Sequence, residues 1–212
     1  MKIVAIVPIK LNNERLPGKN TKMLGDRPLI SYILETLSAC DALDERYVFC
    51  SNERICEYLP KSIEFLRRPG TLDGPTTNFT QIFESFQEKV AADIYVYAHA
   101  TAPYISLESL RECIERVAEG NYDSAFTATK IQDFLWQDGR PLNFDAGNLP
   151  RSQDLEPIYR ESSGIYVFTN EVFTTYHRRV GKNPFIKEIG YREAIDINTA
   201  EDFELAERFL NF

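Results

Sequence analysis

The chain has 212 residues, of which 43% are hydrophobic and 26% charged, and its formal net charge at pH 7 is −8. This composition is typical of a globular protein with room for one sizeable α/β core. A net negative charge argues against binding nucleic acid or a membrane surface through overall charge, so we expect neither partner. The sequence contains no apolar run of ~18 residues and no secretory signal pattern, so we expect a cytoplasmic protein.

The four cysteines are scattered along the chain, without a CxxC pair or an ordered spacing. They are Cys40, Cys50, Cys56 and Cys113. With only two histidines available, this pattern does not indicate a zinc site. We therefore expect free thiols, most of them buried, as in proteins of a reducing compartment.

Hydrophobic periodicity predicts strands that alternate with helices along a single domain, residues 1–212. The expected strands are 2–9, 46–51, 65–69, 93–100, 122–130 and 163–168, and the expected helices are 28–37, 77–90, 106–120 and 198–210. Asn78 and Gln81 have the spacing of a capping pair at the start of the second helix. This alternation is typical of a mostly parallel sheet covered on both faces, in which ligands bind beyond the carboxyl ends of the strands.

Residues 131–161 interrupt this alternation because they show little periodicity. They nevertheless carry three prolines and several large apolar side chains, namely Phe134, Leu135, Trp136, Leu142 and Phe144. An apolar insertion of this length packs either on a partner subunit or over its own domain. The sequence leaves both possibilities open.

The loop after the first strand is rich in cations. It belongs to the stretch VPIKLNNERLPGKN, residues 7–20, and contains Lys10, Arg15 and Lys19, with Gly18 allowing close approach of a ligand to the backbone. Clustered cations and free backbone N–H groups are what phosphates require. The spacing matches neither the P-loop nor the dinucleotide-binding fingerprint. The alternative is a solvated basic turn.

The same loop lies in a segment, AIVPIKLNNERLPGKN, that resembles the N-terminal signature of the sialic acid cytidylyltransferases, the CMP-N-acetylneuraminate synthetases and their bacterial relatives. The residues shared with that signature are Ala5, Ile6, Pro8, Arg15, Pro17, Gly18, Lys19 and Asn20. Further similar motifs follow in the family's order over most of the chain: MLGDRPLISYIL, FCSNE, RRP, AHATAPYIS, RSQDLEPIYRESSGIYVF and EAIDINTAEDFELAE. Ordered motifs of this extent are specific evidence for the family.

The resemblance implies a single α/β domain with a mostly parallel, Rossmann-like sheet of the nucleotide-diphospho-sugar transferase type, and a homodimer formed through the irregular segment 131–161. The implied reaction transfers CMP from CTP to the anomeric hydroxyl of a nine-carbon sialic-acid-like sugar and releases pyrophosphate. Lys10, Arg15 and Lys19 would act on the triphosphate as the catalytic cations. A Mg²⁺ ion is implied on the phosphates, with Asp196 and Asn198 as its protein ligands.

The resemblance also implies which residues contact the two substrates. Those expected at the nucleotide are Pro8, Asn20, Arg68, Thr77 and Asn78, and those expected at the sugar are His99, Gln153 and Tyr166. Structural alternatives stay open for several of them. Arg68 would make a surface ion pair, Thr77 and Asn78 would cap a helix, and Tyr166 would be a core aromatic. His99 would bond to the backbone, Asp196 would make a structural hydrogen bond, and Asn198 would cap the last helix.

Four departures from the family pattern affect the expected site. Lys10 replaces an arginine, LNNE at residues 11–14 replaces GGSK, His99 replaces a glutamine, and Asn198 replaces the second aspartate of an IDID motif. They bear on the choice of sugar and on metal affinity more than on the reaction. Two other functions remain open: a nucleotidyltransferase of the 3-deoxy-manno-octulosonate type, and a homologue that binds CTP or a CMP-sugar without turnover.

Overall fold

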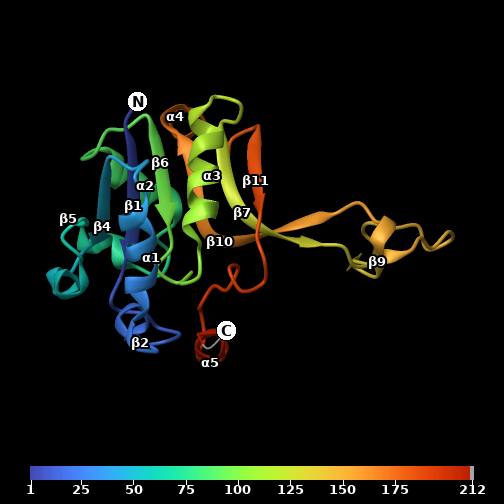
Figure 1. Ribbon diagram of the computed structural model, residues 1–212, viewed down its shortest axis with the longest axis horizontal. Helices are drawn as coiled ribbons and strands as arrows, with labels where there is room; N and C mark the ends of the chain where they lie inside the picture. Colours follow the sequence, from blue (N-terminus) through green and yellow to red (C-terminus); the bar gives the residue numbers. More distant parts are fainter. Residues whose placement is uncertain (211–212) are drawn as a thin grey trace.

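The computed structural model describes residues 1–210 (Figure 1), so residues 211 and 212 of the expected domain 1–212 lie outside the described part. The main strands are β1 (Ile3–Ile9), β4 (Glu45–Cys50), β5 (Glu64–Arg67), β6 (Ile94–Ala98), β7 (Ser124–Ile131), β10 (Ile158–Thr169) and β11 (Pro184–Glu188). The helices are α1 (Leu29–Ala39), α2 (Phe79–Gln87), α3 (Leu107–Ala118), α4 (Asn170–Tyr176) and α5 (Ala200–Phe209). Short hairpins join β2 (Met23–Leu24) to β3 (Arg27–Pro28) and β8 (Trp136–Gln137) to β9 (Arg140–Pro141).

The seven main strands form one sheet in the order β11-β7-β10-β6-β1-β4-β5. Only β10 runs against its neighbours β6 and β7, and the other adjacent pairs are parallel. The expected α/β class with a mostly parallel sheet is therefore confirmed. Each predicted strand and helix is present, with boundaries shifted by a few residues. The sequence did not predict β11, α4 or the two hairpins, which are short and carry weak periodicity.

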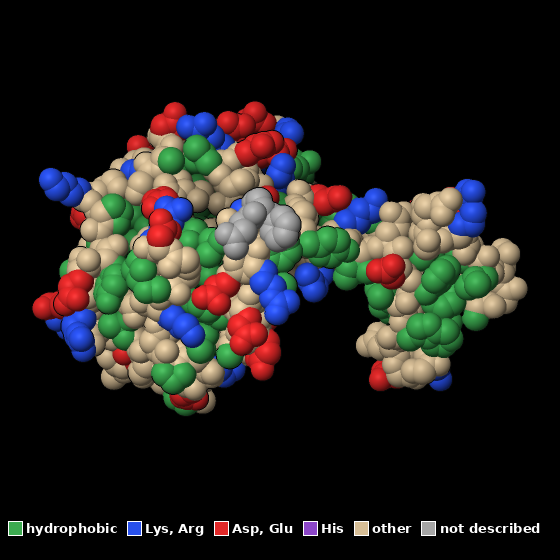
Figure 2. Space-filling model, turned by 60° about the horizontal axis from the view of Figure 1, so that its bottom comes forward, with side chains coloured by type: hydrophobic (Ala, Val, Ile, Leu, Met, Phe, Trp, Pro, Cys, Tyr) green, Lys and Arg blue, Asp and Glu red, His purple; other side chains and the backbone are tan. Residues whose placement is uncertain are grey.

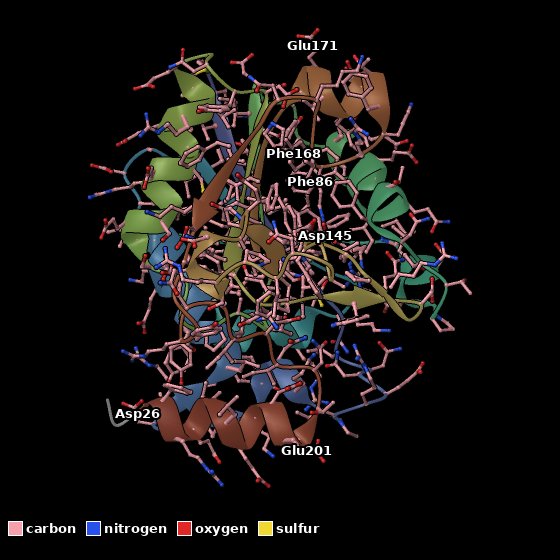
Figure 3. The ribbon with its side chains drawn as sticks, turned by 90° about the vertical axis from the view of Figure 1, so that its right-hand side faces the viewer. Asp26, Phe86, Asp145, Phe168, Glu171 and Glu201 are labelled. Carbon is pink, nitrogen blue, oxygen red and sulfur yellow. The ribbon has the colours of Figure 1, made fainter. Side chains whose placement is uncertain are left out.

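Helices cover both faces of the sheet (Figures 1 and 3). Aliphatic side chains of α1 and α3 pack on one face, whereas aromatic side chains of α2 and α4 fill the other. Phe83 of α2 is fully buried, and its ring centroid lies 4.5 Å from that of Phe173 and 4.8 Å from that of Tyr95. This dense aromatic layer holds β6 and β10 in place, and the ends of those strands carry part of the site described below.

The segment between β7 and β10, residues 132–157, leaves the domain as an extended arm (Figure 1). The alternative that this excursion folds over its own domain is therefore wrong. The arm has a small aromatic cluster of its own, in which the Phe144 ring lies 4.9 Å from Phe134 and 5.4 Å from Trp136. Trp136, Leu142 and Leu149 nevertheless remain 60%, 53% and 64% exposed. Figure 2 shows hydrophobic side chains gathered on one face of the arm.

Within residues 1–210, no helix combines the length and the hydropathy that crossing a membrane requires. The four cysteines are free thiols, and only Cys56 is exposed. This distribution agrees with the expected buried thiols.

The last helix, α5, begins with a capping box formed by Thr199 and Asp202. The Thr199 hydroxyl accepts a hydrogen bond from the Asp202 amide at 3.2 Å. The Asp202 carboxylate accepts from the amides of Asn198 and Thr199, each at 2.9 Å. The alternative role of Asn198 as the helix cap is therefore wrong, because the capping residue is Thr199. Although burial acts to raise it, hydrogen bonds from these amides lower the pKa of Asp202 below its ordinary value.

Replacing Asp202 with alanine should lower the free energy of unfolding by ~1 kcal/mol at pH 7, since the variant loses the carboxylate half of the capping box and leaves the amides of Asn198 and Thr199 without that acceptor. The native pKa is depressed, so this stabilisation is fully present above the ordinary value of 3.8 and is lost as the pH falls through the native value. Urea denaturation at pH 7 and pH 3 measures the effect, with the exposed Glu204→Ala on the same helix as the matched control. A difference of equal size at both pH values would contradict a role for the Asp202 charge.

Candidate active site at the carboxyl edge of the sheet

The loop after β1 buries one of its three cations. Lys19 is 7% exposed, and its Nζ donates a hydrogen bond to the Ile197 carbonyl at 2.6 Å. Gly18, whose φ is +66°, makes the turn that leads into Lys19. Burial lowers the pKa of Lys19, while the charge of Asp196 opposes this effect. A desolvated cation with an incomplete set of partners is well suited to bind an incoming anion.

A chain of hydrogen bonds connects this loop to the segment that precedes α5. Arg15 Nη2 donates to Asn198 Oδ1 at 2.9 Å, and Asn198 Nδ2 donates to Asp196 Oδ2 at 2.7 Å. The other oxygen of Asp196 accepts from the Thr101 hydroxyl at 2.5 Å. The structure thus brings together Arg15, Lys19, Asp196 and Asn198. Thr101 was not predicted as a site residue because nothing in the sequence near it indicates its partner.

A pocket of about 240 Å³ opens between the loop and this segment. Its walls include Lys10, Arg15, Lys19, Asn198 and, from the facing loop, Pro75. Glu14 also lines it, so the negative charge of the LNNE stretch does lie at the pocket. The three predicted cations therefore line one pocket, in which Lys19 is buried and Arg15 remains exposed to solvent.

Two further predicted residues support the loop from beneath. Asn20 is 5% exposed, and its Nδ2 donates to the Lys10 carbonyl at 3.0 Å, which fixes the width of the loop. Its Oδ1 is buried without a hydrogen-bond partner among the described residues. Pro8 is half-buried on β1, next to Phe49 of β4. Pro8 and Asn20 therefore lie at the base of the site.

Arg68 lies beyond the end of β5, on the other side of β4 from the loop. It is 3% exposed and makes an ion pair with Asp73, whose carboxylate also accepts from the Ser51 hydroxyl. Arg68 therefore does make an ion pair, as the structural alternative expected, but its side chain is buried and not on the surface. Arg68 Nε is buried without a partner in the described residues. Such an unsatisfied donor suits a polar ligand.

Thr77 and Asn78 start helix α2 at the same edge. Asn78 and Gln81 form the predicted capping box, with hydrogen bonds of 3.1 and 3.0 Å. Thr77 is half-buried, and its amide donates to the Gly74 carbonyl at 3.3 Å. The expected cap at Asn78 is confirmed, and the contact of both residues with a nucleotide stays a prediction.

His99 follows β6, between the rings of Tyr97 and Tyr166, at 5.3 and 6.0 Å. Its Nε2 is buried without a partner among the described residues, so the alternative of a side chain bonded to the backbone finds no support there. Burial lowers the pKa of His99 to about 3, and the charges of Arg179 and Lys19 act in the same direction. His99 is therefore neutral at pH 7 and can exchange hydrogen bonds without carrying a charge.

Tyr166 of β10 is both a core aromatic and a polar contributor to the site. Its ring is 1% exposed, and its hydroxyl donates to Glu161 Oε1 at 2.5 Å. Arg179, which follows α4, lies over that ring with its guanidinium carbon 3.6 Å from the centroid. Arg179 was missed from the sequence, because the basic stretch HRR after a short helix gives no sign of where it packs.

Gln153 is the predicted site residue that this chain does not bring to the others. It is exposed on the arm, in the short helical turn Ser152–Asp154, and its carbonyl accepts from Gln132 Nε2 at 3.0 Å. The arm projects away from the body that carries the pocket (Figure 1). Contact of Gln153 with a sugar stays a prediction, and it would take place in a neighbouring copy of the chain.

The chain matches the family model described as cytidylyltransferase over residues 4–211. It is 23% identical to the 3-deoxy-manno-octulosonate cytidylyltransferase of Acaryochloris marina, over 99% of this chain and 98% of that protein. It is 26% identical to the CMP-N,N'-diacetyllegionaminic acid synthase of Legionella pneumophila, over 99% and 97%. It is 24% identical to the N-acylneuraminate cytidylyltransferase A of Danio rerio, and there it spans about half of the relative, 51%.

Among solved structures, the fold is similar to that of a CMP:2-keto-3-deoxy-manno-octonic acid synthetase complexed with CTP, with a TM-score of 0.74. The alignment covers 100% of this chain and 99% of the other at 17% identity, so it bears on the fold alone. The family model and the relatives agree with the family expected from the sequence motifs. The chain belongs to the cytidylyltransferase family.

Proposed function

We propose that the protein is an acylneuraminate-type cytidylyltransferase. It transfers CMP from CTP to the anomeric hydroxyl of a nine-carbon sialic-acid-like sugar and releases pyrophosphate. The observation that carries the proposal is the buried Lys19, which lines one pocket with Lys10 and Arg15 and lies opposite Asp196. Relatives named for N-acylneuraminate, legionaminic acid and pseudaminic acid support the sugar class.

The reaction requires charge neutralisation and alignment more than covalent catalysis. The acceptor hydroxyl oxygen forms a bond to the α-phosphorus, the bond from that phosphorus to the bridging oxygen breaks with its electron pair staying on pyrophosphate, and the hydroxyl proton passes to water. Lys10, Arg15 and Lys19 hold the phosphate oxygens and stabilise the charge that develops on pyrophosphate. The Lys19–Ile197 and Arg15–Asn198 hydrogen bonds fix two of these cations before substrate binds.

A second candidate acceptor is 3-deoxy-manno-octulosonate. A relative and a solved structure of this specificity align along nearly the whole chain. Both acceptors are α-keto acids activated at the anomeric carbon, so the same pocket chemistry serves either one. A binding protein without turnover is disfavoured, because the cation pocket and the Asp196 carboxylate are assembled together.

Replacing Lys19 with glutamine should reduce kcat/KM for CTP by ~10²–10³-fold, since the triphosphate loses a pre-positioned cation. Pyrophosphate release is measured with CTP, Mg²⁺ and a panel of nine-carbon and eight-carbon keto-acid sugars, with ATP, GTP and UTP as controls. The exposed Lys61→Gln is the matched control and should behave as wild type. A kcat/KM for CTP in Lys19→Gln equal to that of the wild type would contradict the site, and release with another nucleotide alone would contradict the proposed function.

The residues at Asp196 fit a Mg²⁺ ion bound mainly by the substrate phosphates. Asp196 supplies one carboxylate, and no group of three acidic, histidine or cysteine side chains suited to a metal occurs within residues 1–210. Mg²⁺ commonly takes one or two carboxylates and completes its shell with phosphate and water. The Asn198 amide oxygen accepts a hydrogen bond from Arg15. If Asn198 were a metal ligand, the same oxygen would contact both the Arg15 guanidinium and the Mg²⁺ ion. When bound, Mg²⁺ would neutralise phosphate charge.

Replacing Asn198 with aspartate should lower the Mg²⁺ concentration that gives half-maximal activity, by about tenfold, since a second carboxylate raises the affinity for the ion. Calorimetric titration of Mg²⁺ into the protein with CTP bound should show the same shift without reference to turnover. Asp196→Asn is the opposite change and should weaken Mg²⁺ binding. An unchanged Mg²⁺ requirement in Asn198→Asp would contradict the placement of the metal at residue 198.

We also propose that the arm joins two copies of the chain into a homodimer. Trp136, Leu142 and Leu149 are more than half exposed on a segment that projects away from its own domain. Exposed apolar surface of this kind is typical of an interface. In such a dimer the arm could carry Gln153 to the neighbouring pocket.

Trp136→Asp should shift the protein from a dimer toward a species with the 24.4 kDa mass of one chain, because a charge at the interface opposes burial. Light scattering coupled to size-exclusion chromatography measures the mass. Tyr176→Asp, at a partly exposed aromatic on α4, is the control and should leave the mass unchanged. A wild-type protein of single-chain mass at micromolar concentration would contradict the dimer.

A further inference from the structure

Arg179 is a rigidly held cation that the mechanism above does not use. Its guanidinium carbon lies 3.6 Å from the centroid of the Tyr166 ring, and its Nη2 donates to the Tyr166 hydroxyl at 2.9 Å. The same nitrogen reaches Glu161 Oε1 at 3.5 Å. Within residues 1–210, neither Nε nor Nη1 of Arg179 donates a hydrogen bond. Since the side chain remains 27% exposed, a pre-positioned guanidinium keeps one edge available for a ligand.

Along the sheet, Arg179 is separated from Arg68 and from the phosphate loop, although its guanidinium carbon lies 5.6 Å from the ring centroid of Phe79, the residue after Asn78. Arg68 lies at β5 and the phosphate loop at β1, whereas Arg179 covers β10, beyond β6. From β5 to β10 there are four strand spacings, or about 19 Å. This span accommodates a nucleotide and a second molecule side by side. His99, which follows β6, has its ring 6.0 Å from that of Tyr166, over which Arg179 lies.

Glu161 does not neutralise Arg179 in a way that would exclude a ligand. Its carboxylate already accepts the Tyr166 hydroxyl at 2.5 Å, and it is 45% exposed to water at the base of the arm. Its 3.5 Å separation from Arg179 is at the limit of a hydrogen bond. An exposed ion pair of this length is weak. Glu161 and Tyr166 therefore orient the guanidinium and leave most of its donors free.

A planar guanidinium with a free edge is matched best by a carboxylate, which it binds through two parallel N–H···O bonds. We propose that Arg179, oriented by Tyr166, binds the carboxylate of the acceptor sugar and so determines its specificity for acidic sugars. This assignment rests on the proposed function, in which the acceptor is an α-keto acid. The carboxylate of such a sugar adjoins the anomeric carbon, so this contact also fixes the attacking hydroxyl.

The test compares the keto-acid sugar with its C1 carboxamide, in the wild type and in Arg179→Gln. The variant should raise KM for the acid about 10- to 100-fold, the range of a hydrogen-bonded charge pair, and leave KM for CTP within about twofold. The wild type should prefer the acid over the carboxamide, and Arg179→Gln should lose that preference. Arg178→Gln removes the neighbouring exposed cation and should match the wild type.

Two outcomes would overturn the assignment while the proposed function stands. Equal losses for acid and carboxamide would show that Arg179 acts through structure alone, and a raised KM for CTP would place it on the triphosphate. A wild type without turnover on any keto acid would instead refute the proposed function. In that case, calorimetry measures binding of the keto-acid sugar to the protein with a non-hydrolysable CTP analogue bound. Tighter binding of the acid to the wild type than to Arg179→Gln supports the assignment. Equal binding to both proteins, or no binding to either, overturns it.

Discussion

The hydrogen bond from Lys19 Nζ to the Ile197 carbonyl is the contact on which the site depends. Withdrawing an ammonium group from water is costly unless it is paired and hydrogen-bonded, so this contact, with Asp196 nearby, stabilises the buried cation. It also ties together segments that are 178 residues apart in the chain. Because Ile197 is fully buried in the cluster that seats α5, the position of that helix and the shape of the pocket lined by Lys19 are linked.

The sheet order determines which groups can meet this lysine. Parallel strands β5, β4, β1 and β6 end at one edge, and their following loops carry the cations and the polar groups. The reversed strand β10 contributes differently, since it passes the same edge in mid-strand and presents Tyr166 opposite Tyr97. Arg179 lies over Tyr166 because the preceding helix α4 is held in the aromatic layer, where its Phe173 packs against Phe83 of α2. The aromatic core therefore orients a polar residue of the site.

Sequence reasoning predicts the parts of the site that follow local rules. Lys10, Arg15 and Lys19 follow a buried strand, and the rule for parallel sheets places them at the ligand edge, whereas Asp196 lies in an irregular segment before α5 and not on a strand of the sheet. The alternative that Asn198 caps α5 is wrong, because Asn198 and Thr199 are both good caps and only the structure shows that Thr199 caps the helix while Asn198 donates to Asp196. Arg179 could not be predicted, since its position depends on long-range packing of a short helix. The same limit applies to the direction of the arm, which sequence periodicity does not encode.

The neutral residue at position 198 changes the charge balance of the pocket. An aspartate there would pair with Arg15 as an anion, whereas Asn198 offers Arg15 only a carbonyl dipole. Arg15 is therefore oriented without being neutralised, and more of its charge remains available to phosphate oxygens. The same substitution removes a carboxylate from the place where Mg²⁺ would bind. If the pocket binds Mg²⁺ and the triphosphate as proposed, this substitution would lower metal affinity while the cationic side chains stay, so that the protein would neutralise a larger share of the triphosphate charge.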